Sequence, residues 1–456
     1  MNRVASRSTI ALVLAVILLG GMCLFLVEYI LNAGDWVVFQ GNPHVYTGVN
    51  IGCGTITDRS GEVLLNATDE RTYAEDAAVR KSTIHWLGDR YGYISAPAVT
   101  EYAQDMAGFD LLNGLYGYSG IGGGAELTIS AELQKRALDA MGKKKGTVAV
   151  YNYKTGEILC AVTTPNYDPD NVPDIDEGKD KYEGIYVNRF TQTTYVPGSV
   201  FKLVTAAAAL DTMDNALEIQ FRCDGSYKMS GGKVKCTGEH GKIGLKKALQ
   251  KSCNCYFAQL TEVLGADTLE KYVKQLQITE PVSFDGITTA RGSFSVEDAS
   301  AQQIAWAGIG QYLDTVNPCR YMTFMGVIAG GGEAAEPYLV SSAGSGLLGG
   351  YKASKSTTGR LMDRDTAEAL GALMRSNVEN QYGDDNFPGL TVCAKSGTAE
   401  VGGDKKPNAT FAGFCADEDY PLAFFVVVED AGSGAKTCVP IIAEVLEGCK
   451  DLLDRE

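Results

Sequence analysis

Residues 195–202 read Tyr195-Val196-Pro197-Gly198-Ser199-Val200-Phe201-Lys202, and the Ala-rich run 203–210 follows without a break. The Pro-Gly pair interrupts whatever precedes it, and the residues from Ser199 onward contain no helix breaker, so a helix starting at Ser199 is predicted. Ser199 and Lys202 then lie one turn apart on the same face. A lysine in a dry pocket loses its proton more readily and can act as the base for a serine nucleophile. Because S-x-x-K is short and also fits an ordinary capped helix, the catalytic interpretation depends on partners elsewhere in the chain.

The composition excludes one broad class of function. The chain has 456 residues, a formal net charge of −16 and 45% hydrophobic residues. This length accommodates two or three domains. An acidic chain offers no basic stripe to neutralise phosphates, so we expect no nucleic-acid partner and interpret the charge as a contribution to solubility.

The N-terminal region predicts a membrane anchor. No charged residue occurs between Ile10 and Val27, and the apolar character resumes beyond Glu28, so residues 10–31 are predicted to span the lipid bilayer. Arg3 and Arg7 precede this span, which places residues 1–9 in the cytoplasm and everything after residue 31 outside the cell. The alternative is a cleaved signal peptide, which has a shorter apolar core and ends in an A-x-A-like site. The sequence therefore predicts a single-pass protein of the cell membrane.

Residues 32–125 are predicted to form a small juxtamembrane module. Residues 32–52 have the composition of an extended linker. Two short apolar runs around a polar Asp-Arg-Ser-Gly turn predict a hairpin over residues 53–65. The Gly-rich run 120–124 lacks the Gly-Lys-Ser/Thr ending of a phosphate loop, so a flexible connection is predicted there.

Residues 126–456 are predicted to form one large α+β domain, in which distant segments close an antiparallel sheet around an inserted helical subdomain. Strand patterns occur at 146–153, 157–162, 390–395, 410–414 and 421–429. Helical patterns occur at 131–141 with Ser130 as the cap, from 199, from 244 to about 277, at 296–309, at about 363–380 and at about 440–453. Residues 167–183 and 340–360 are predicted loops. The acidic residues of the first loop lack EF-hand spacing, so they predict no metal site.

The twelve cysteines leave an alternative open. Cys223 and Cys236 flank a Gly-rich stretch and could form a local disulfide, as exported thiols often do. The other interpretation is a set of free, mostly buried thiols. Because the cysteines are scattered and do not form C-x-x-C pairs, no zinc site is expected.

Three short motifs follow one another along the chain. They are Ser199-x-x-Lys202, then Ser252-Cys253-Asn254 on a predicted turn between helices, and then Lys395-Ser396-Gly397-Thr398 at a predicted strand end. This set resembles the active-site motifs of penicillin-binding proteins and serine β-lactamases. The resemblance extends over about residues 50–440, and further segments carry it: 53–61, 154–159, 188–189, 195–198 and 308–311. The chain is identified as a member of the class B penicillin-binding proteins, which implies the penicillin-binding transpeptidase fold.

The resemblance implies a role for each motif residue. Ser199 would be the acylated nucleophile, Lys202 its general base, and Ser252 the relay of a proton to the leaving amine. Asn254 would bind the amide of the acyl donor. Lys395, counted with these four as catalytic, would hold the substrate carboxylate together with Thr398, and Ser396, Gly397 and Thr398 would form the substrate-binding set. The N–H groups of Ser199 and Thr398 would form the oxyanion hole. We further expect Gly397 to let the substrate backbone approach closely.

The implied function is a peptidoglycan D,D-transpeptidase that cross-links stem peptides and is inhibited by β-lactam antibiotics, without a cofactor or metal. The resemblance also implies a membrane-embedded glycan polymerase of the SEDS type as partner, and it is compatible with roles in cell elongation and shape, cell division or sporulation. The alternatives are a D,D-carboxypeptidase or β-lactamase, with Glu239 or the acids of 168–183 as candidate bases, and a non-catalytic penicillin-binding scaffold or sensor. None of the three histidines, His44, His85 and His240, lies in a hydrolase-like motif, which disfavours a Ser-His-Asp triad.

Overall fold

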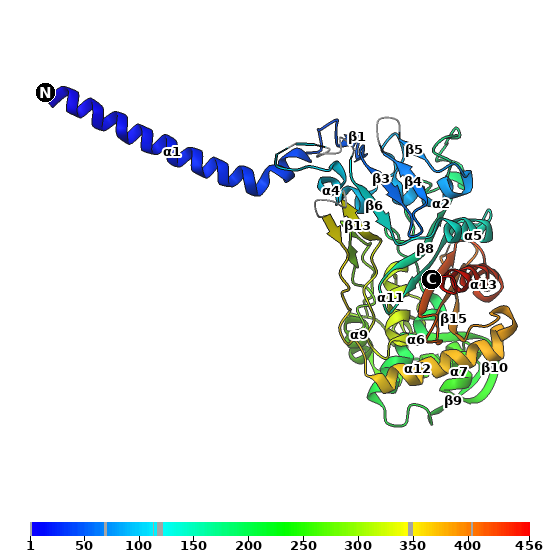
Figure 1. Cartoon of the computed structure of the whole chain (residues 1–456). Helices are drawn as coiled ribbons and strands as arrows, with labels where there is room; N and C mark the ends of the chain where they lie inside the picture. Colours follow the sequence, from blue (N-terminus) through cyan, green and yellow to red (C-terminus); the bar gives the residue numbers. More distant parts are fainter. Residues whose placement is uncertain (1, 68–70, 113, 116–121, 345–349, 403–404) are drawn as a thin grey trace.

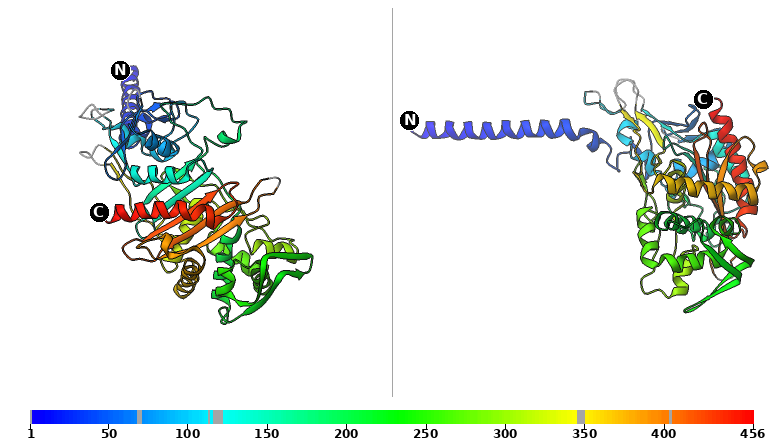
Figure 2. Two further views of the ribbon diagram at one scale, coloured as in Figure 1. Left: turned by 90° about the vertical axis from the view of Figure 1, so that its right-hand side faces the viewer. Right: turned by 90° about the horizontal axis from the view of Figure 1, so that it is seen from below.

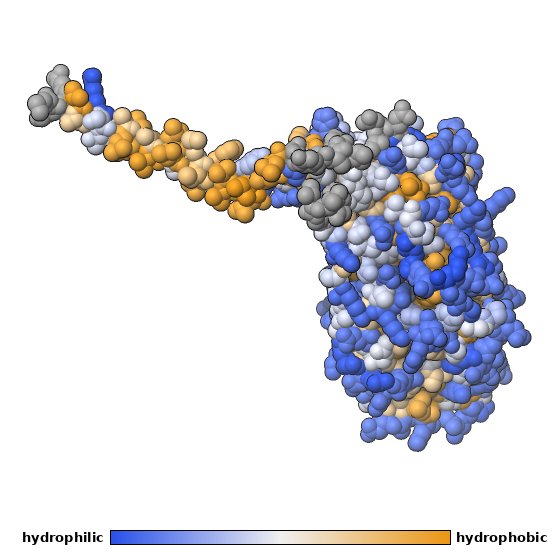
Figure 3. Space-filling view, in the orientation of Figure 1, coloured by the Kyte–Doolittle hydropathy of each residue, from blue (hydrophilic) through white to orange (hydrophobic). Residues whose placement is uncertain are grey.

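The computed structural model describes residues 2–67, 71–112, 114–115, 122–344, 350–402 and 405–456. One long helix, α1 (Asn2–Val37), extends away from a folded body that contains the other elements (Figure 1). The helix is apolar along most of its length (Figure 3). Its segment Val4–Val37 is long and apolar enough to cross a membrane, and none of its most apolar 18-residue stretch is buried against the rest of the protein. The chain therefore carries an N-terminal segment suited to single-pass anchoring, which contains the predicted span 10–31.

Residues 32–52 do not form the extended linker that the sequence predicted. Helix α1 continues through Val37, and a two-stranded ribbon follows, made of β1 (Tyr46–Thr47) and β2 (Asn50–Ile51). Val45 and Ile51 are fully buried, so this segment belongs to the folded body. The prediction was wrong because strands of two residues carry no alternation that a sequence pattern can reveal.

The body nearest α1 contains a mixed six-stranded sheet. Its order is β14-β13-β6-β3-β4-β5, with β3 and β6 parallel. The bounds are β3 (Thr55–Thr57), β4 (Val63–Asn66), β5 (Thr72–Tyr73), β6 (Gly124–Leu127), β13 (Val340–Gly344) and β14 (Gly350–Lys352). The pair β3–β4 confirms the predicted hairpin. The prediction of a loop at 340–360 was wrong, because this region contains β13 and β14. Strand β13 pairs with β6, which is distant in the chain, and composition does not reveal such a pairing.

Three helices cover this part of the body: α2 (Ala77–Leu87), α3 (Pro97–Thr100) and α4 (Ala103–Ala107). Of the Gly-rich run 120–124, predicted as a flexible connection, residues 120 and 121 lie outside the described residues. Its described end joins the sheet instead, because Gly123 is hydrogen-bonded to Met106 and Thr55 and Gly124 begins β6. The sheet joins strands from before residue 125 to strands after residue 340, so the juxtamembrane module and the large domain share one sheet. The predicted domain limits 32–125 and 126–456 remain a prediction.

The second sheet is antiparallel throughout and has the order β15-β16-β17-β7-β8. Its bounds are β7 (Gly146–Asn152), β8 (Ile158–Thr164), β15 (Val392–Ala399), β16 (Asn408–Cys415) and β17 (Leu422–Val428). These strands match the five predicted from the sequence, and they confirm the α+β class. Strand β15 lies at the edge, and the Lys395–Thr398 motif lies inside it instead of at its end.

Helices cover both faces of this sheet. On one face lie α5 (Ala131–Met141) and the C-terminal α13 (Gly434–Leu453), whose apolar side chains pack into the sheet core. Ser130 caps α5 as predicted, with Oγ accepting from the Leu133 N–H at 3.4 Å. On the other face lie α6 (Lys202–Thr212), α11 (Pro318–Ala329) and α12 (Arg364–Asn377), which separate the sheet from the helical subdomain.

The helical subdomain lies at the end of the body away from α1 (Figures 1 and 2). It contains α7 (Leu245–Gln250), α8 (Asn254–Leu264), α9 (Ala266–Gln275), α10 (Ala301–Ala307) and the short pair β11 (Ser283–Phe284) and β12 (Ile287–Thr288). A long antiparallel hairpin of β9 (Gln220–Met229) and β10 (Gly232–Gly244) packs against α8. The sequence indicated only a polar, partly hairpin-like stretch here, because few of its residues are buried.

Candidate active site

The turn before α6 places Ser199. Residues Gly198–Phe201 form one turn of 3₁₀ helix, η2, and the α-helix begins only at Lys202. Gly198 has φ +59°, a conformation that favours glycine, and its N–H donates to the Gly310 carbonyl at 2.8 Å. The Tyr321 hydroxyl donates to the Val200 carbonyl at 2.8 Å. The turn is thus tied to two other segments, which fixes the direction of the Ser199 side chain.

Lys202 lies at the centre of the site and is fully buried. Its Nζ lies 2.9 Å from Ser199 Oγ, 2.8 Å from the Ser252 carbonyl and 2.7 Å from Asn254 Oδ1. Burial lowers the pKa of Lys202 to about 7. A neutral amine has two N–H donors and one lone pair, which match the carbonyl and amide oxygens as acceptors and the Ser199 hydroxyl as donor. The geometry suits a lysine that takes the proton from Ser199.

Ser252-Cys253-Asn254 forms the turn between α7 and α8, as the sequence predicted. Ser252 has φ +50°, a left-handed conformation that is uncommon outside glycine and is often held at functional sites. The turn directs the Ser252 carbonyl and the Asn254 side-chain oxygen at the same amine, that of Lys202. Asn254 also donates through Nδ2 to the Lys235 carbonyl of β10 at 3.0 Å. This contact joins the turn to the hairpin.

Lys395 enters the site from strand β15. Its side chain is buried, and its Nζ donates to Ser252 Oγ at 3.1 Å and to the Ser396 carbonyl at 2.5 Å. Burial, together with the neighbouring charge of Lys202, lowers the pKa of Lys395. Ser252 therefore lies between two lysines, and its hydroxyl can pass a proton between them and a group in the cleft.

Tyr382 supports the edge strand and was not predicted from the sequence. It lies at the end of a π-helical turn, η3 (Val378–Tyr382), that continues α12. Its hydroxyl accepts the Ser396 N–H at 2.9 Å and is hydrogen-bonded to Ser396 Oγ, also at 2.9 Å. A side chain thus satisfies a strand N–H next to Lys395. A lone tyrosine at a helix end carries no sequence signal for such a contact.

Gly397 is required by packing within the protein. A Cβ at this position would collide with Oγ1 of Thr410 and lie 2.9 Å from the Pro197 carbonyl oxygen. The contact between β15 and the turn that carries Ser199 thus requires a glycine here by itself, and the close approach of a substrate backbone stays a prediction. Thr398, one residue further, is exposed and lies at the mouth of the site.

Ser199, Asn254 and Thr398 line one cleft of about 810 Å³. The hairpin strand β10 forms part of its wall, and α10 with the residues that follow forms another; the further lining residues are Lys233, Val234, Lys235, Gln302, Trp306, Ile309, Gln311, Tyr312 and Glu400. Of these, only Ile309 and Gln311 fall within the segments that carried the family resemblance. Asp168, from the acidic loop considered as a source of a hydrolytic base, instead pairs with Arg80 at 2.7 Å.

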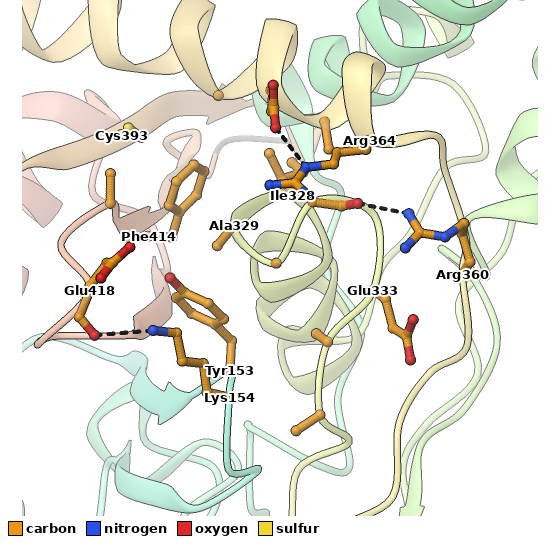
Figure 4. Close-up of a pocket in the computed structure, with 18 of the residues that line it drawn as sticks. Tyr153, Lys154, Ile328, Ala329, Glu333, Arg360, Arg364, Cys393, Phe414 and Glu418 are labelled. Atoms are coloured by element: carbon orange, nitrogen blue, oxygen red, sulfur yellow. Dashed lines mark hydrogen bonds and ion pairs between the residues drawn. The ribbon is translucent and has the colours of Figure 1, made fainter.

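A second cavity, of about 750 Å³, lies between α11, α12 and the far end of the sheet (Figure 4). Tyr153, Phe414 and Cys393 line its apolar side, while Arg360 and Arg364 lie on the opposite side (Figure 4). The Lys154 amine donates to the Glu418 carbonyl at its rim, at 3.1 Å. The predicted catalytic residues are not among those that line it, so it is separate from the acylation site.

Comparisons with known proteins agree with this geometry. A family model of the penicillin binding protein transpeptidase domain matches residues 146–447. The peptidoglycan D,D-transpeptidase PbpA of Mycobacterium tuberculosis is 28% identical over 362 residues, covering 72% of each chain, and PbpA of Mycolicibacterium smegmatis is 30% identical over 343 residues, covering 68% of each. The solved structure of penicillin-binding protein A from M. tuberculosis, as a ceftriaxone acyl-enzyme complex, has a TM-score of 0.75 and 25% identity, covering 87% of this chain and 98% of that one.

Proposed function

The chain belongs to the penicillin-binding protein transpeptidase family, as its motifs predicted, and we propose that it cross-links peptidoglycan stem peptides through an acyl-enzyme on Ser199. It is a serine-type peptidoglycan D,D-transpeptidase of class B. One observation supports the assignment of residues above all others: the Lys202 amine lies 2.9 Å from the Ser199 hydroxyl and 3.1 Å from the Ser252 hydroxyl. A nucleophile, its base and a proton relay are thus in direct contact.

The acylation step uses Lys202 as the base. Its neutral amine accepts the Ser199 proton while Oγ forms a bond to the carbonyl carbon of the penultimate D-Ala of the donor stem. The N–H groups of Ser199 and Thr398 stabilise the negative charge that develops on the carbonyl oxygen. The proton then passes through the Ser252 hydroxyl to the amide nitrogen, the C–N bond breaks, and the terminal D-Ala leaves as a neutral amine. Ser199 is left as an ester of the stem peptide.

The second step transfers the acyl group. An amine from a neighbouring stem attacks the ester carbonyl, its excess proton returns through the same relay, and Ser199 Oγ leaves and is protonated again from Lys202. Two acyl transfers thereby replace one difficult amide exchange. β-Lactams would acylate the same oxygen because they resemble the donor.

Substrate recognition falls to Asn254 and strand β15. We assign Asn254 to the donor amide, and Lys395 with Thr398 to the terminal carboxylate, supported by the exposure of Thr398 at the cleft. A carboxylate favours the charged form of a nearby amine. Although burial lowers the pKa of Lys395, a bound donor would therefore keep this lysine protonated.

The topology we propose has residues 1–9 in the cytoplasm and the body on the outer face, supported by Arg3 and Arg7 before the apolar helix. The substrate lies on that face. Because the proposed domain limits leave only 32–125 between anchor and transpeptidase, glycan polymerisation would come from a separate SEDS-type membrane partner.

The test uses the full-length protein in detergent with a fluorescent penicillin. Wild type, Ser199→Ala and the exposed-serine control Ser356→Ala are labelled, free drug is removed, and the covalent adduct is followed over time. We expect a persistent adduct on wild type and control and none on Ser199→Ala. An adduct on Ser199→Ala would refute the nucleophile assignment.

The same experiment separates the alternatives. Loss of the wild-type adduct within minutes would favour a carboxypeptidase or β-lactamase. A scaffold role predicts that Ser199→Ala complements a deletion strain, whereas a transpeptidase role predicts that it does not.

A further inference from the structure

Four metal-binding side chains come together beside the active site. Cys223 lies on β9, Cys236 and His240 lie on β10, and Cys253 caps the N-terminus of α8. Their four ligand atoms all lie within 4.8 Å of one another. Cys223 and Cys253 are buried, and the other two are half-buried. Cysteines that are scattered along the sequence are therefore brought together by the fold, although their spacing predicted no zinc site.

The distances within the cluster fit a tetrahedral zinc ion. The sulfurs of Cys236 and Cys253 are 3.8 Å apart, and Nδ1 of His240 lies 3.5 Å from the Cys223 sulfur and 3.6 Å from the Cys236 sulfur. Zinc bonds of about 2.3 Å to sulfur and about 2.05 Å to nitrogen, at tetrahedral angles, place two sulfurs about 3.8 Å apart and a sulfur and a nitrogen about 3.6 Å apart. A disulfide would require about 2.05 Å between sulfurs. Cys223 and Cys236, the pair considered for a disulfide, are both free thiols.

The backbone of β10 is shaped to build this cluster. Cys236 and His240 are four residues apart, which would separate them by about 13 Å along a regular strand. The pairing of β10 with β9 is interrupted twice, between Lys235 and Glu239 and between Glu239 and Gly241. Bulges of this kind re-aim side chains, and here they bring Cys236 and His240 to the same point beside Cys223. A hairpin stabilised by pairing alone needs no such irregularity.

We propose that Cys223, Cys236, His240 and Cys253 bind one zinc ion in a closed Cys₃His site. Thiolate sulfur and imidazole nitrogen are the donors that zinc prefers, and four protein ligands complete its tetrahedral shell and leave no open position for a substrate. Binding releases the three thiol protons to solvent and leaves the histidine neutral. The Tyr256 N–H, 3.4 Å from the Cys253 sulfur, gives that thiolate a second-shell donor.

The site has a structural role with a direct consequence for catalysis. Cys253 lies between Ser252 and Asn254, the two residues of this turn that contact Lys202. The other three ligands come from the hairpin whose residues 233–235 line the cleft. The metal thus clamps the proton-relay turn to the cleft wall, adding to the Asn254–Lys235 hydrogen bond. It also protects three thiols from oxidation in an exported protein.

The first test measures metal content. Full-length protein is purified without added metal, and its metal content is measured by elemental mass spectrometry. We expect about one zinc per chain. The double variant Cys223→Ser/Cys236→Ser should lose it, while Cys319→Ser, a buried thiol outside the cluster, should keep it. Wild-type protein with zinc stripped and cobalt(II) added should show the visible bands of a tetrahedral thiolate-bound ion, and the double variant should not.

The second test separates this site from other arrangements of the sulfurs. Cys255 also approaches Cys236, so Cys255→Ser should retain zinc. Loss of zinc in Cys255→Ser with retention in Cys223→Ser would overturn the ligand assignment. A different result would overturn the proposal itself: wild-type protein that contains no zinc and carries a Cys223–Cys236 disulfide. The disulfide would be seen as the loss of the mass of two hydrogens under non-reducing conditions.

The third test addresses the clamp. Chelation of wild type should lower the melting temperature and slow acylation by penicillin severalfold, and zinc should restore both. Chelator should leave the double variant unchanged. If stoichiometric zinc can be removed and returned without changing either quantity, the metal does not clamp the turn.

Discussion

Lys202 and Lys395 each place Nζ 3.1 Å from the same atom, Oγ of Ser252. One lysine comes from a helix and the other from the edge of the main sheet. Two ammonium groups this close, both buried, repel each other, so each lowers the tendency of the other to carry a proton. The site therefore favours one neutral lysine, and the acylation mechanism requires that it be Lys202.

The first prediction concerns pH. The pKa of Lys202 is about 7 in place of 10.5, and only its neutral form can accept the Ser199 proton. The acylation rate should thus rise with pH, about tenfold per unit below pH 7, and level off above it. Stopped-flow measurement of penicillin acylation checks this. A rate independent of pH between about 5 and 9 would contradict Lys202 as the base.

The same pKa has a consequence for stability. The unfolded chain holds the Lys202 proton up to about pH 10.5, whereas the folded chain releases it near 7. In that window the unfolded state binds more protons, so the contribution of Lys202 to the free energy of unfolding increases as pH rises. Urea titrations of wild type and Lys202→Met at several pH values measure it. The free energy of unfolding of wild type relative to Lys202→Met should rise between pH 7 and 10.5 and be constant below pH 7, where both states hold the proton.

The two lysines should differ in kinetic effect. Lys202→Ala removes the base, and the maximal rate of acylation should fall by about 10²–10⁴-fold. Lys395→Ala removes the partner of the donor carboxylate, so it should mainly raise the penicillin concentration at which the rate saturates. Saturation kinetics of both variants separate the effects. If Lys395→Ala lowers the maximal rate and Lys202→Ala mainly raises the saturating concentration, Lys395 is the base and Lys202 binds the carboxylate.

Tyr382→Phe should weaken the edge strand next to Lys395. The change leaves the half-buried Ser396 N–H without its acceptor, which costs about 1 kcal/mol in the free energy of unfolding. Acylation should slow as well. Tyr420→Phe is the matched control, because its hydroxyl bonds Asp454 at the surface. Equal effects of the two substitutions would show that the contact with Ser396 is unimportant.

Gly397→Ala should be destabilising by about 1–3 kcal/mol, since the new methyl group meets Thr410 and the Pro197 carbonyl. It should also slow acylation, because Pro197 precedes the turn that carries Ser199. Adding Thr410→Ala removes one of the two collisions and should restore part of the lost stability, measured by thermal unfolding. If the substrate backbone alone explains this glycine, stability will be unaffected and only acylation will fall.

Long, strongly patterned elements were predictable from the sequence. The five strands of the main sheet and the helices near 131–141, 363–380 and 440–453 follow local patterns of burial and capping. Elements defined by distant partners were not. Helix α11 is buried on nearly all sides between sheet and subdomain, so its sequence shows no clear amphipathic period. Strand β13 owes its strand form to pairing with β6.

The sequence by itself determined the family and the identity of the motif residues. The reason is that S-x-x-K, S-x-N and K-S-G-T contain the side chains that the chemistry requires, in a fixed order along the chain. It also determined the apolar helix, since length and composition suffice for that. Only the tertiary structure brought Lys202 and Lys395 to one hydroxyl and showed that Gly397 is constrained by Thr410. It alone gathered the Cys₃His cluster as well. These relationships depend on strand register, bulges and close packing between segments far apart in the chain, and local sequence does not encode where such segments meet.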